Sequence, residues 1–119
     1  MKSILIVEPS DVVRGELEAA LQKDYRICAC ASGEEAEDLF MCCQPDGLLI
    51  NLRLPGMDGL YFLEQHEQYL PPVIITLAAS YSPPLEQRLV DLGVHLRCVV
   101  AGQRLFHQED RHRRWSLER

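Results

Sequence analysis

Residues 46–59 place a polar side chain where an apolar run meets a turn. The apolar run at residues 48–50 leads directly into Asn51, and a Pro-Gly turn follows at residues 55–56. A carboxylate at the end of such a run could act as a nucleophile, whereas the carboxamide of an asparagine cannot. The identity of residue 51 therefore decides whether covalent chemistry is available at this position.

A second oxygen-bearing side chain follows another apolar run. Residues 4–7 are all aliphatic, and Glu8 comes directly after them, ahead of Pro9. Asp11 falls in the first turn of a predicted helix, where a carboxylate stabilises the helix N-terminus. We therefore interpret Asp11 as a helix-stabilising residue, and keep a ligand role beside Glu8 as the alternative.

Apolar runs and helical stripes alternate along the chain. The runs at residues 4–7, 48–50 and 73–77 predict strands buried on both faces, and further strands are expected at residues 25–31 and 95–100. Apolar residues at helical spacing predict four helices, which begin near Ser10, Glu34, Asp58 and Ser82. A weaker stripe containing Leu105, Phe106 and Trp115 predicts a fifth helix at the end of the chain.

This alternation with short loops predicts an α/β fold with a doubly wound parallel sheet of five strands in the order 2-1-3-4-5. Helices on both faces make it a three-layer sandwich. In such sheets the functional crevice lies beyond the C-terminal ends of the strands. Those ends carry Glu8, Asn51, Leu77 and Val100, so we expect these residues to lie close together.

Length and charge limit the classes of function. A chain of 119 residues fits one domain, and we expect a domain at residues 1–106 followed by the end of the last helix, or a linker, at residues 107–119. The net charge of −6 disfavours direct binding to nucleic acid. No apolar run is long enough for a membrane helix or a secretory signal, which predicts a cytoplasmic protein that does not bind membranes.

The five cysteines are expected to be reduced thiols that pack as small apolar residues. Their number is odd, and no pair has the spacing of a zinc site. Cys28 and Cys30 are two residues apart in a predicted strand, so they share a face and leave metal or redox chemistry as the alternative.

Three segments give the chain a resemblance to a known family. They are residues 51–59 (NLRLPGMDG), residues 72–75 (PVII) and residues 90–94 (VDLGV). Residues 2 to about 106 resemble a response-regulator receiver domain of two-component signalling, which has a flavodoxin-like fold like that of CheY. The resemblance implies a phosphorelay signalling domain whose phosphoryl group is carried on an aspartate.

The resemblance also shows which family positions have changed. Glu8 matches the first acidic residue of the magnesium site, Pro9 replaces the second, and Asn51 replaces the phosphate-accepting aspartate. Arg53 matches the residue whose backbone carbonyl completes the metal shell. With so few negative ligands, Mg²⁺ binding is expected to be weak or absent, and no other cofactor is expected.

Two more family positions have lost their polar groups. Leu77 stands where the family has a serine or threonine, and Val100 stands where it has the lysine that pairs with phosphoryl oxygens. Ala101 replaces the proline that usually follows. Asn51 is therefore expected to be part of a degenerate site rather than a single missing nucleophile.

These departures lead to a functional hypothesis. We predict a receiver-like domain that is not an enzyme, acts independently of phosphorylation and works through contacts with signalling proteins. Arg88, Arg97, Arg104 and Phe106 mark its candidate output surface, through which a homodimer is possible. Two alternatives stay open, namely residual phosphotransfer to an aspartate or histidine with Mg²⁺, and binding of a small ligand in the more apolar crevice.

Overall fold

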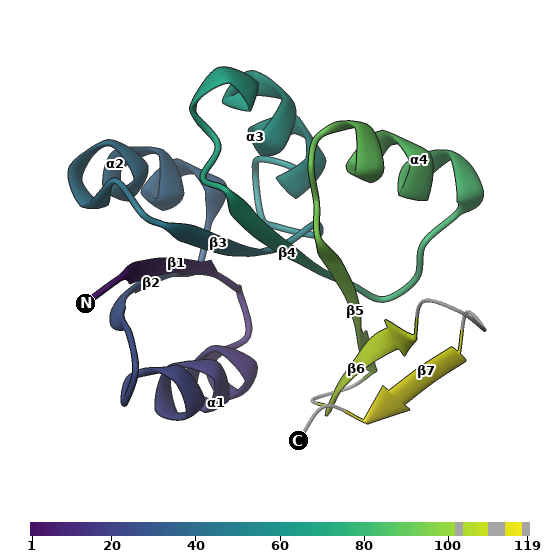
Figure 1. Cartoon of the computed structure of the whole chain (residues 1–119), viewed down its shortest axis with the longest axis horizontal. Coiled ribbons are helices and arrows are strands. Elements are labelled where there is room, and N and C mark those ends of the chain that lie inside the picture. The colour runs from purple at the N-terminus through teal and green to yellow at the C-terminus, as the bar shows by residue number, and fades with distance from the viewer. Residues whose placement is uncertain (102–103, 110–113, 118–119) are drawn as a thin grey trace.

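The protein is built on one seven-stranded sheet with the strand order β2-β1-β3-β4-β5-β6-β7 (Figure 1). The computed structural model describes residues 1–101, 104–109 and 114–117, with side chains described up to residue 100. The strands are β1 (Ser3–Val7), β2 (Arg26–Cys30), β3 (Gly47–Asn51), β4 (Val73–Ala78), β5 (Leu96–Ala101), β6 (Arg104–Glu109) and β7 (Arg114–Leu117). The helices are α1 (Asp11–Leu21), α2 (Gly33–Cys43), α3 (Gly59–Gln65) and α4 (Pro83–Asp91), with a short 3₁₀ helix at Glu67–Tyr69.

The first five strands are parallel and have the predicted order 2-1-3-4-5. The predicted α/β fold is therefore confirmed. Each of the four α-helices also follows a polar residue whose side chain accepts a hydrogen bond from the first turn. These N-caps are Ser10, Ser32, Asp58 and Ser82.

The prediction of a fifth helix is wrong for the described residues. Residues 104–109 and 114–117 form strands β6 and β7, which extend the sheet in antiparallel fashion beyond β5. The apolar stripe in this segment is weak, and the open edge of β5 offers unpaired backbone groups that β6 can bond. The predicted boundary after residue 106 falls inside β6.

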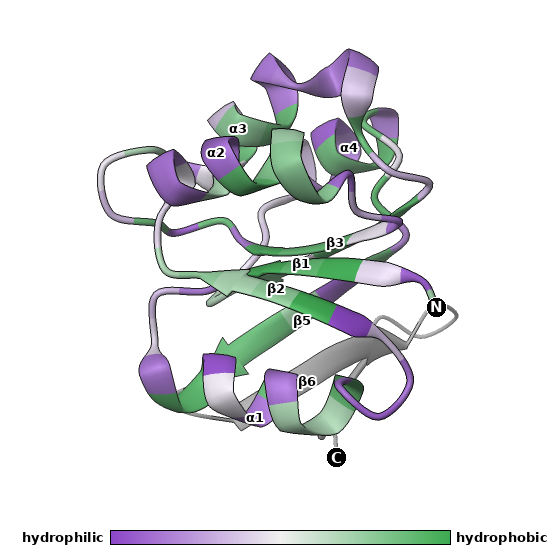
Figure 2. Cartoon of the chain, turned by 90° about the vertical axis from the view of Figure 1, so that its left-hand side faces the viewer, coloured by the Kyte–Doolittle hydropathy of each residue, from purple (hydrophilic) through white to green (hydrophobic). Residues whose placement is uncertain are grey.

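The larger part of the core lies between the sheet and helices α2, α3 and α4. Figure 2 shows these three helices on one side of the hydrophobic strands and α1 on the other. Phe62 of α3 is fully buried, and its ring meets the edge of Phe40 from α2 at a centroid distance of 5.8 Å. Burial of such large rings fixes α2 and α3 against the sheet.

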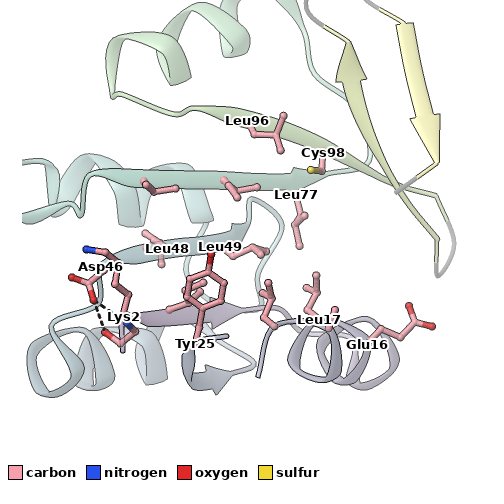
Figure 3. Close-up of a pocket in the computed structure, with 17 residues that line it drawn as sticks. Lys2, Glu16, Leu17, Tyr25, Asp46, Leu48, Leu49, Leu77, Leu96 and Cys98 are labelled. Carbon is pink, nitrogen blue, oxygen red and sulfur yellow. Dashed lines mark hydrogen bonds between the residues drawn. The ribbon is translucent and has the colours of Figure 1, made fainter. Parts of the chain in front are cut away.

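The opposite face is covered by α1 along only part of its width. An apolar groove of about 630 Å³ runs beside α1 (Figure 3). Its walls include Leu17 of α1, Leu77 of β4 and Leu96 and Cys98 of β5. None of the described helices has the length and hydrophobicity that a membrane crossing requires.

The expectation that all five cysteines are reduced is wrong for one pair. Cys28 in β2 and Cys43 at the end of α2 form a disulfide, whereas Cys30, Cys42 and Cys98 are free. The sequence gives no signal for this pairing, because it depends on how the last turn of α2 packs against β2.

Candidate functional site

Glu8 and Asn51 meet at the C-terminal ends of the neighbouring strands β1 and β3. Strands β1 and β3 are neighbours with Val7 in register with Ile50, and Glu8 and Asn51 are the next residues along the two strands. The side-chain Nδ2 of Asn51 donates a hydrogen bond of 2.8 Å to Oε1 of Glu8. Both side chains are buried, with exposed fractions of 9% for Asn51 and 1% for Glu8. The predicted proximity of these two strand ends is confirmed.

The remaining oxygens of the pair also accept hydrogen bonds. The second carboxylate oxygen of Glu8 accepts from the backbone N–H of Ser10 at 2.8 Å. Oδ1 of Asn51 accepts from the backbone N–H of Arg53, also at 2.8 Å. Each side-chain oxygen of the carboxylate and the carboxamide thus accepts a hydrogen bond, and the amide nitrogen donates one between them.

Arg14 brings a positive charge to the rim of the Glu8–Asn51 pair. Its Nη1 donates to the backbone carbonyl of Glu8 at 2.8 Å, and its Nη2 donates to Asp11. The Asp11 side chain is 89% exposed. Asp11 therefore holds Arg14 at the start of α1, and the structure does not bring its carboxylate into the Glu8–Asn51 pair. Among residues 1–101, no three His, Cys, Asp or Glu side chains are grouped so that they could hold a metal ion.

Two backbone hydrogen bonds fix the loop after Asn51, one to β4 and one from the start of α3. The N–H of Leu52 donates to the carbonyl of Leu77 at 2.8 Å, and the N–H of Gly59 donates to the carbonyl of Leu52 at 2.9 Å. The first turn of α2 lies against this loop, with Gly33 close to the side chain of Met57 and Glu34 close to Gly56. Gly56 has a φ of 78°, a conformation that glycine adopts without strain.

Among the described contacts, the side chains of the other predicted positions give Asn51 no hydrogen bond. Leu77 is in register with Asn51, and its side chain is buried in a small apolar cluster with Ile6, Leu49 and Cys98. Val100 packs against the same cluster. Pro9 follows Glu8 in the turn that leads to α1, and the side chain of Arg53 is exposed.

An open hollow of about 430 Å³ lies at the ends of β3 and β4. Its lining includes Arg53, Asp58, Ala78 and Ser80, but not Leu77 or Val100. The apolar residues that suggested a ligand crevice thus face a different side of the sheet from this hollow.

Sequence reasoning missed Tyr81, in the loop between β4 and α4. Its hydroxyl lies 2.8 Å from the carbonyl oxygen of Cys98 and 3.1 Å from Oγ1 of the fully buried Thr76. Burial raises the pKa of Tyr81 above its ordinary value. One tyrosine within a polar loop carries no periodic signal, so only the fold reveals that it ties the loop to β4 and β5.

The Tyr81→Phe variant is expected to be less stable by about 1 kcal/mol at neutral pH, because the buried hydrogen bond from the Tyr81 hydroxyl to the carbonyl of Cys98 is lost. The raised pKa gives the natural chain stability that is complete below the unfolded pKa, at roughly 10, and is lost as the pH rises through the folded pKa. The difference between the two chains should therefore shrink above pH ~10. Urea unfolding across this range checks it, with Tyr69→Phe, at a residue 71% exposed, as the control. A constant difference would contradict the role of the hydroxyl.

The four residues of the candidate output surface lie on three different elements, α4, β5 and β6. Nε of Arg88 in α4 lies 2.9 Å from a carboxylate oxygen of Glu64 in α3, and Nε of Arg97 in β5 lies 4.0 Å from one of Glu86 in α4. Arg104 and Phe106 belong to β6 rather than to a fifth helix, and their side chains lie outside the described part. Arg88 and Arg97 thus contribute to the packing of α3, α4 and β5.

Comparisons with known proteins agree with this architecture. Residues 4–97 match the family described as the response regulator receiver domain. The chain is 35% identical to the transcriptional regulatory protein YxdJ of Bacillus subtilis over 80 residues, which are 66% of this chain and 35% of that protein. It is 42% identical to the DNA-binding transcriptional regulator NtrC of Klebsiella pneumoniae over 78 residues, which are 63% of this chain and 17% of that protein. The chain thus spans about a third or less of these relatives.

Solved structures show the same fold. The N-terminal domain of an uncharacterized protein from Wolinella succinogenes superposes with a TM-score of 0.76 at 28% identity, covering 83% of this chain and 82% of that one. The chemotaxis protein CheY4 of Vibrio cholerae superposes with a TM-score of 0.73 at 25% identity, covering 83% of this chain and 86% of that one. The family match covers most of the chain and the order of the parallel strands agrees with it, so this chain belongs to the response regulator receiver domain family and serves two-component signalling.

Proposed function

We propose that this receiver domain acts without phosphorylation and signals through protein contacts. The hydrogen bond between Asn51 and Glu8 is the observation that supports this proposal most directly. In the phosphate-accepting position Asn51 offers an amide, which is not a nucleophile, and its N–H group occupies the carboxylate oxygen that a cation would otherwise bind. The same contact leads us to propose that Mg²⁺ binds weakly or not at all.

The surroundings of the pair support the same proposal. Charge on a transferred phosphoryl group needs positive or hydrogen-bonding partners, and the two nearby strand positions that could supply them are Leu77 and Val100. Both pack into an apolar cluster. A phosphoryl group at residue 51 would therefore meet aliphatic side chains there.

Incubation with acetyl phosphate and millimolar Mg²⁺, followed by intact-mass measurement, tests this proposal. We expect no adduct of about 80 Da, the mass of a phosphoryl group. A receiver domain with an aspartate at the equivalent position serves as the positive control in the same buffer. A stable adduct on this chain would support residual phosphotransfer instead, and loss of that adduct in Glu8→Gln would identify Glu8 as part of its site.

The kind of partner follows from the family and the length of the match. The curated relatives named above are transcriptional regulators of which the chain spans only part. We propose that the domain passes its signal to another signalling protein, or to further domains of its own protein, from a cytoplasmic location. A homodimer is part of the proposal. Light scattering that shows only monomer at high micromolar concentration would remove this part without affecting the rest.

A further inference from the structure

The Cys28–Cys43 disulfide joins an edge of the sheet to the end of a helix. Cys28 lies in β2, the first strand of the sheet order, and Cys43 is the last residue of α2. The bond closes a segment of the chain with a sequence separation of 15. Both cysteines are partly rather than fully buried.

The closed segment contains two contacts with the site described above. The carbonyl of Cys30 accepts a 3.0 Å hydrogen bond from the backbone N–H of Glu8. In the same segment, Gly33 and Glu34 at the start of α2 lie against the loop that follows Asn51. Fixing α2 on β2 therefore also fixes the neighbours of Glu8 and of that loop.

The backbone next to Cys43 gives an independent reason for a bond at this point. Gln44 ends α2 with a φ of 46°, in the left-handed region that residues other than glycine rarely adopt. The helical hydrogen bonding of α2 stops at this residue, so its last turn is held from one side only. A covalent link from Cys43 to β2 opposes fraying of that turn.

The neighbouring cysteines are poor competitors for the same bond. Cys30 is buried with its thiol directed at the carbonyl of Ser32, and burial raises its pKa to about 11, which keeps the thiol protonated and unreactive. Cys42 is exposed and is the residue before Cys43 in α2. Adjacent helical residues point in different directions, so Cys42 does not face β2 as Cys43 does.

We propose that Cys28 and Cys43 form a reversible oxidative modification site that sets how firmly α2 is held on the sheet. The oxidant is a low-molecular-weight disulfide such as oxidised glutathione. The thiolate of one cysteine attacks it, forms a mixed disulfide and releases one glutathione thiol. The thiolate of the other cysteine then forms the Cys28–Cys43 bond and releases the second thiol. Two electrons pass from the cysteines to glutathione, and the two cysteine protons end on the released thiols.

Counting thiols tests the chemistry of this site. The full chain is equilibrated in oxidised or reduced glutathione, quenched with acid, unfolded and alkylated, and its intact mass is then measured by mass spectrometry. The fully reduced chain has five thiols to label, and we expect two fewer labels after oxidation. Equal labelling in both buffers would overturn the proposal, and so would a bond that millimolar reduced glutathione leaves intact in the folded chain, because the bond would then be permanent.

Peptide mapping identifies the partners. Cleavage after glutamate separates Cys28 and Cys30 from Cys42 and Cys43, because Glu34, Glu35 and Glu37 lie between them. The Cys30→Ser/Cys42→Ser double variant should still show a cross-link between the two fragments. If this variant showed no cross-link, Cys30 or Cys42 would be one of the bonded cysteines and the proposed pairing of Cys28 with Cys43 would be wrong.

A pair of neighbouring variants tests the consequence for α2. In Cys42→Ser, reduction should lower the unfolding midpoint by roughly 10 °C and speed amide hydrogen exchange in α2, because the closed loop is released. In Cys43→Ser, oxidised and reduced glutathione should give the same midpoint and the same exchange. A midpoint that responds equally in both variants would contradict the assignment. This inference does not depend on whether the domain is phosphorylated.

Discussion

Replacing Gly59 with alanine is expected to lower the free energy of unfolding by about 3–4 kcal/mol. Gly59 is the first residue of α3, and a Cβ atom there would lie 2.5 Å from the carbonyl oxygen of Asn51 and 2.7 Å from the Cα of Leu52. Both are backbone atoms at the end of β3. These atoms cannot move apart easily, because backbone hydrogen bonds hold them in place. The N–H of Leu52 donates to the carbonyl of Leu77, and the N–H of Gly59 donates to the carbonyl of Leu52. Denaturant unfolding followed by circular dichroism measures the loss.

Gly15→Ala is the matched control for this change. Gly15 lies in the interior of α1 and a Cβ atom there would meet nothing within 4 Å. Alanine should therefore stabilise the helix by about 0.5–1 kcal/mol. Opposite signs for the two variants are the expected result. A loss below about 1 kcal/mol for Gly59→Ala would show that α3 does not press on the backbone that carries Asn51.

The sequence predicts those parts of the fold in which local pattern and burial agree. Residues such as Leu48, Ile50 and Ile74 stand in unbroken apolar runs, and they are buried in the central strands. Ser10 and Asp58 cap helices because their side-chain oxygens accept a hydrogen bond from an unpaired N–H of the first turn, which is a local effect that the sequence shows. The meeting of Glu8 and Asn51 followed from one topological rule, that parallel strands end at the same edge.

The rest depends on contacts between segments far apart in the sequence. The strand β6 forms because the edge of β5 is available to it, and its own apolar pattern does not distinguish a strand from a helix. Cys43 meets Cys28, and Tyr81 meets Cys98, only after helices and loops have been packed on the sheet. The hydrogen bonds of Asn51 with Glu8 and with the backbone of Arg53 were likewise not predicted, because the sequence indicates which residues meet but not which atoms form hydrogen bonds.

The other large effect is expected for Asn51→Asp, which should destabilise the protein by about 3 kcal/mol at pH 8. The substitution replaces the N–H group that donates to Glu8 by a carboxylate oxygen 2.8 Å away, in a buried site. Two acceptors then face each other, and like charge and burial raise the pKa of the new carboxyl group. Thermal and denaturant unfolding measure the loss.

The pH dependence of this variant has a definite sign. Because the folded-state pKa of residue 51 is raised above its unfolded value of about 3.9, protonation favours the folded state of the variant. The deficit relative to the natural chain should be smallest below pH ~4 and should grow as the pH rises through the folded pKa. A deficit that is equal at pH 5 and pH 8 would mean that the two carboxyl groups do not share the site.

A double variant that exchanges the carboxylate of Glu8 and the amide of Asn51 tests whether repulsion causes the loss. The alternative is that any substitution at residue 51 destabilises the protein. In the Glu8→Gln/Asn51→Asp double variant, an amide at residue 8 can donate to the carboxylate at residue 51 and still accept from the N–H of Ser10, while residue 51 still accepts from Arg53. We therefore expect most of the lost stability to return. Neither variant should gain a phosphoryl group from acetyl phosphate, because Pro9, Leu77 and Val100 stay in place. An adduct on Asn51→Asp alone would show that one changed residue, rather than a degenerate site, keeps this receiver from being phosphorylated.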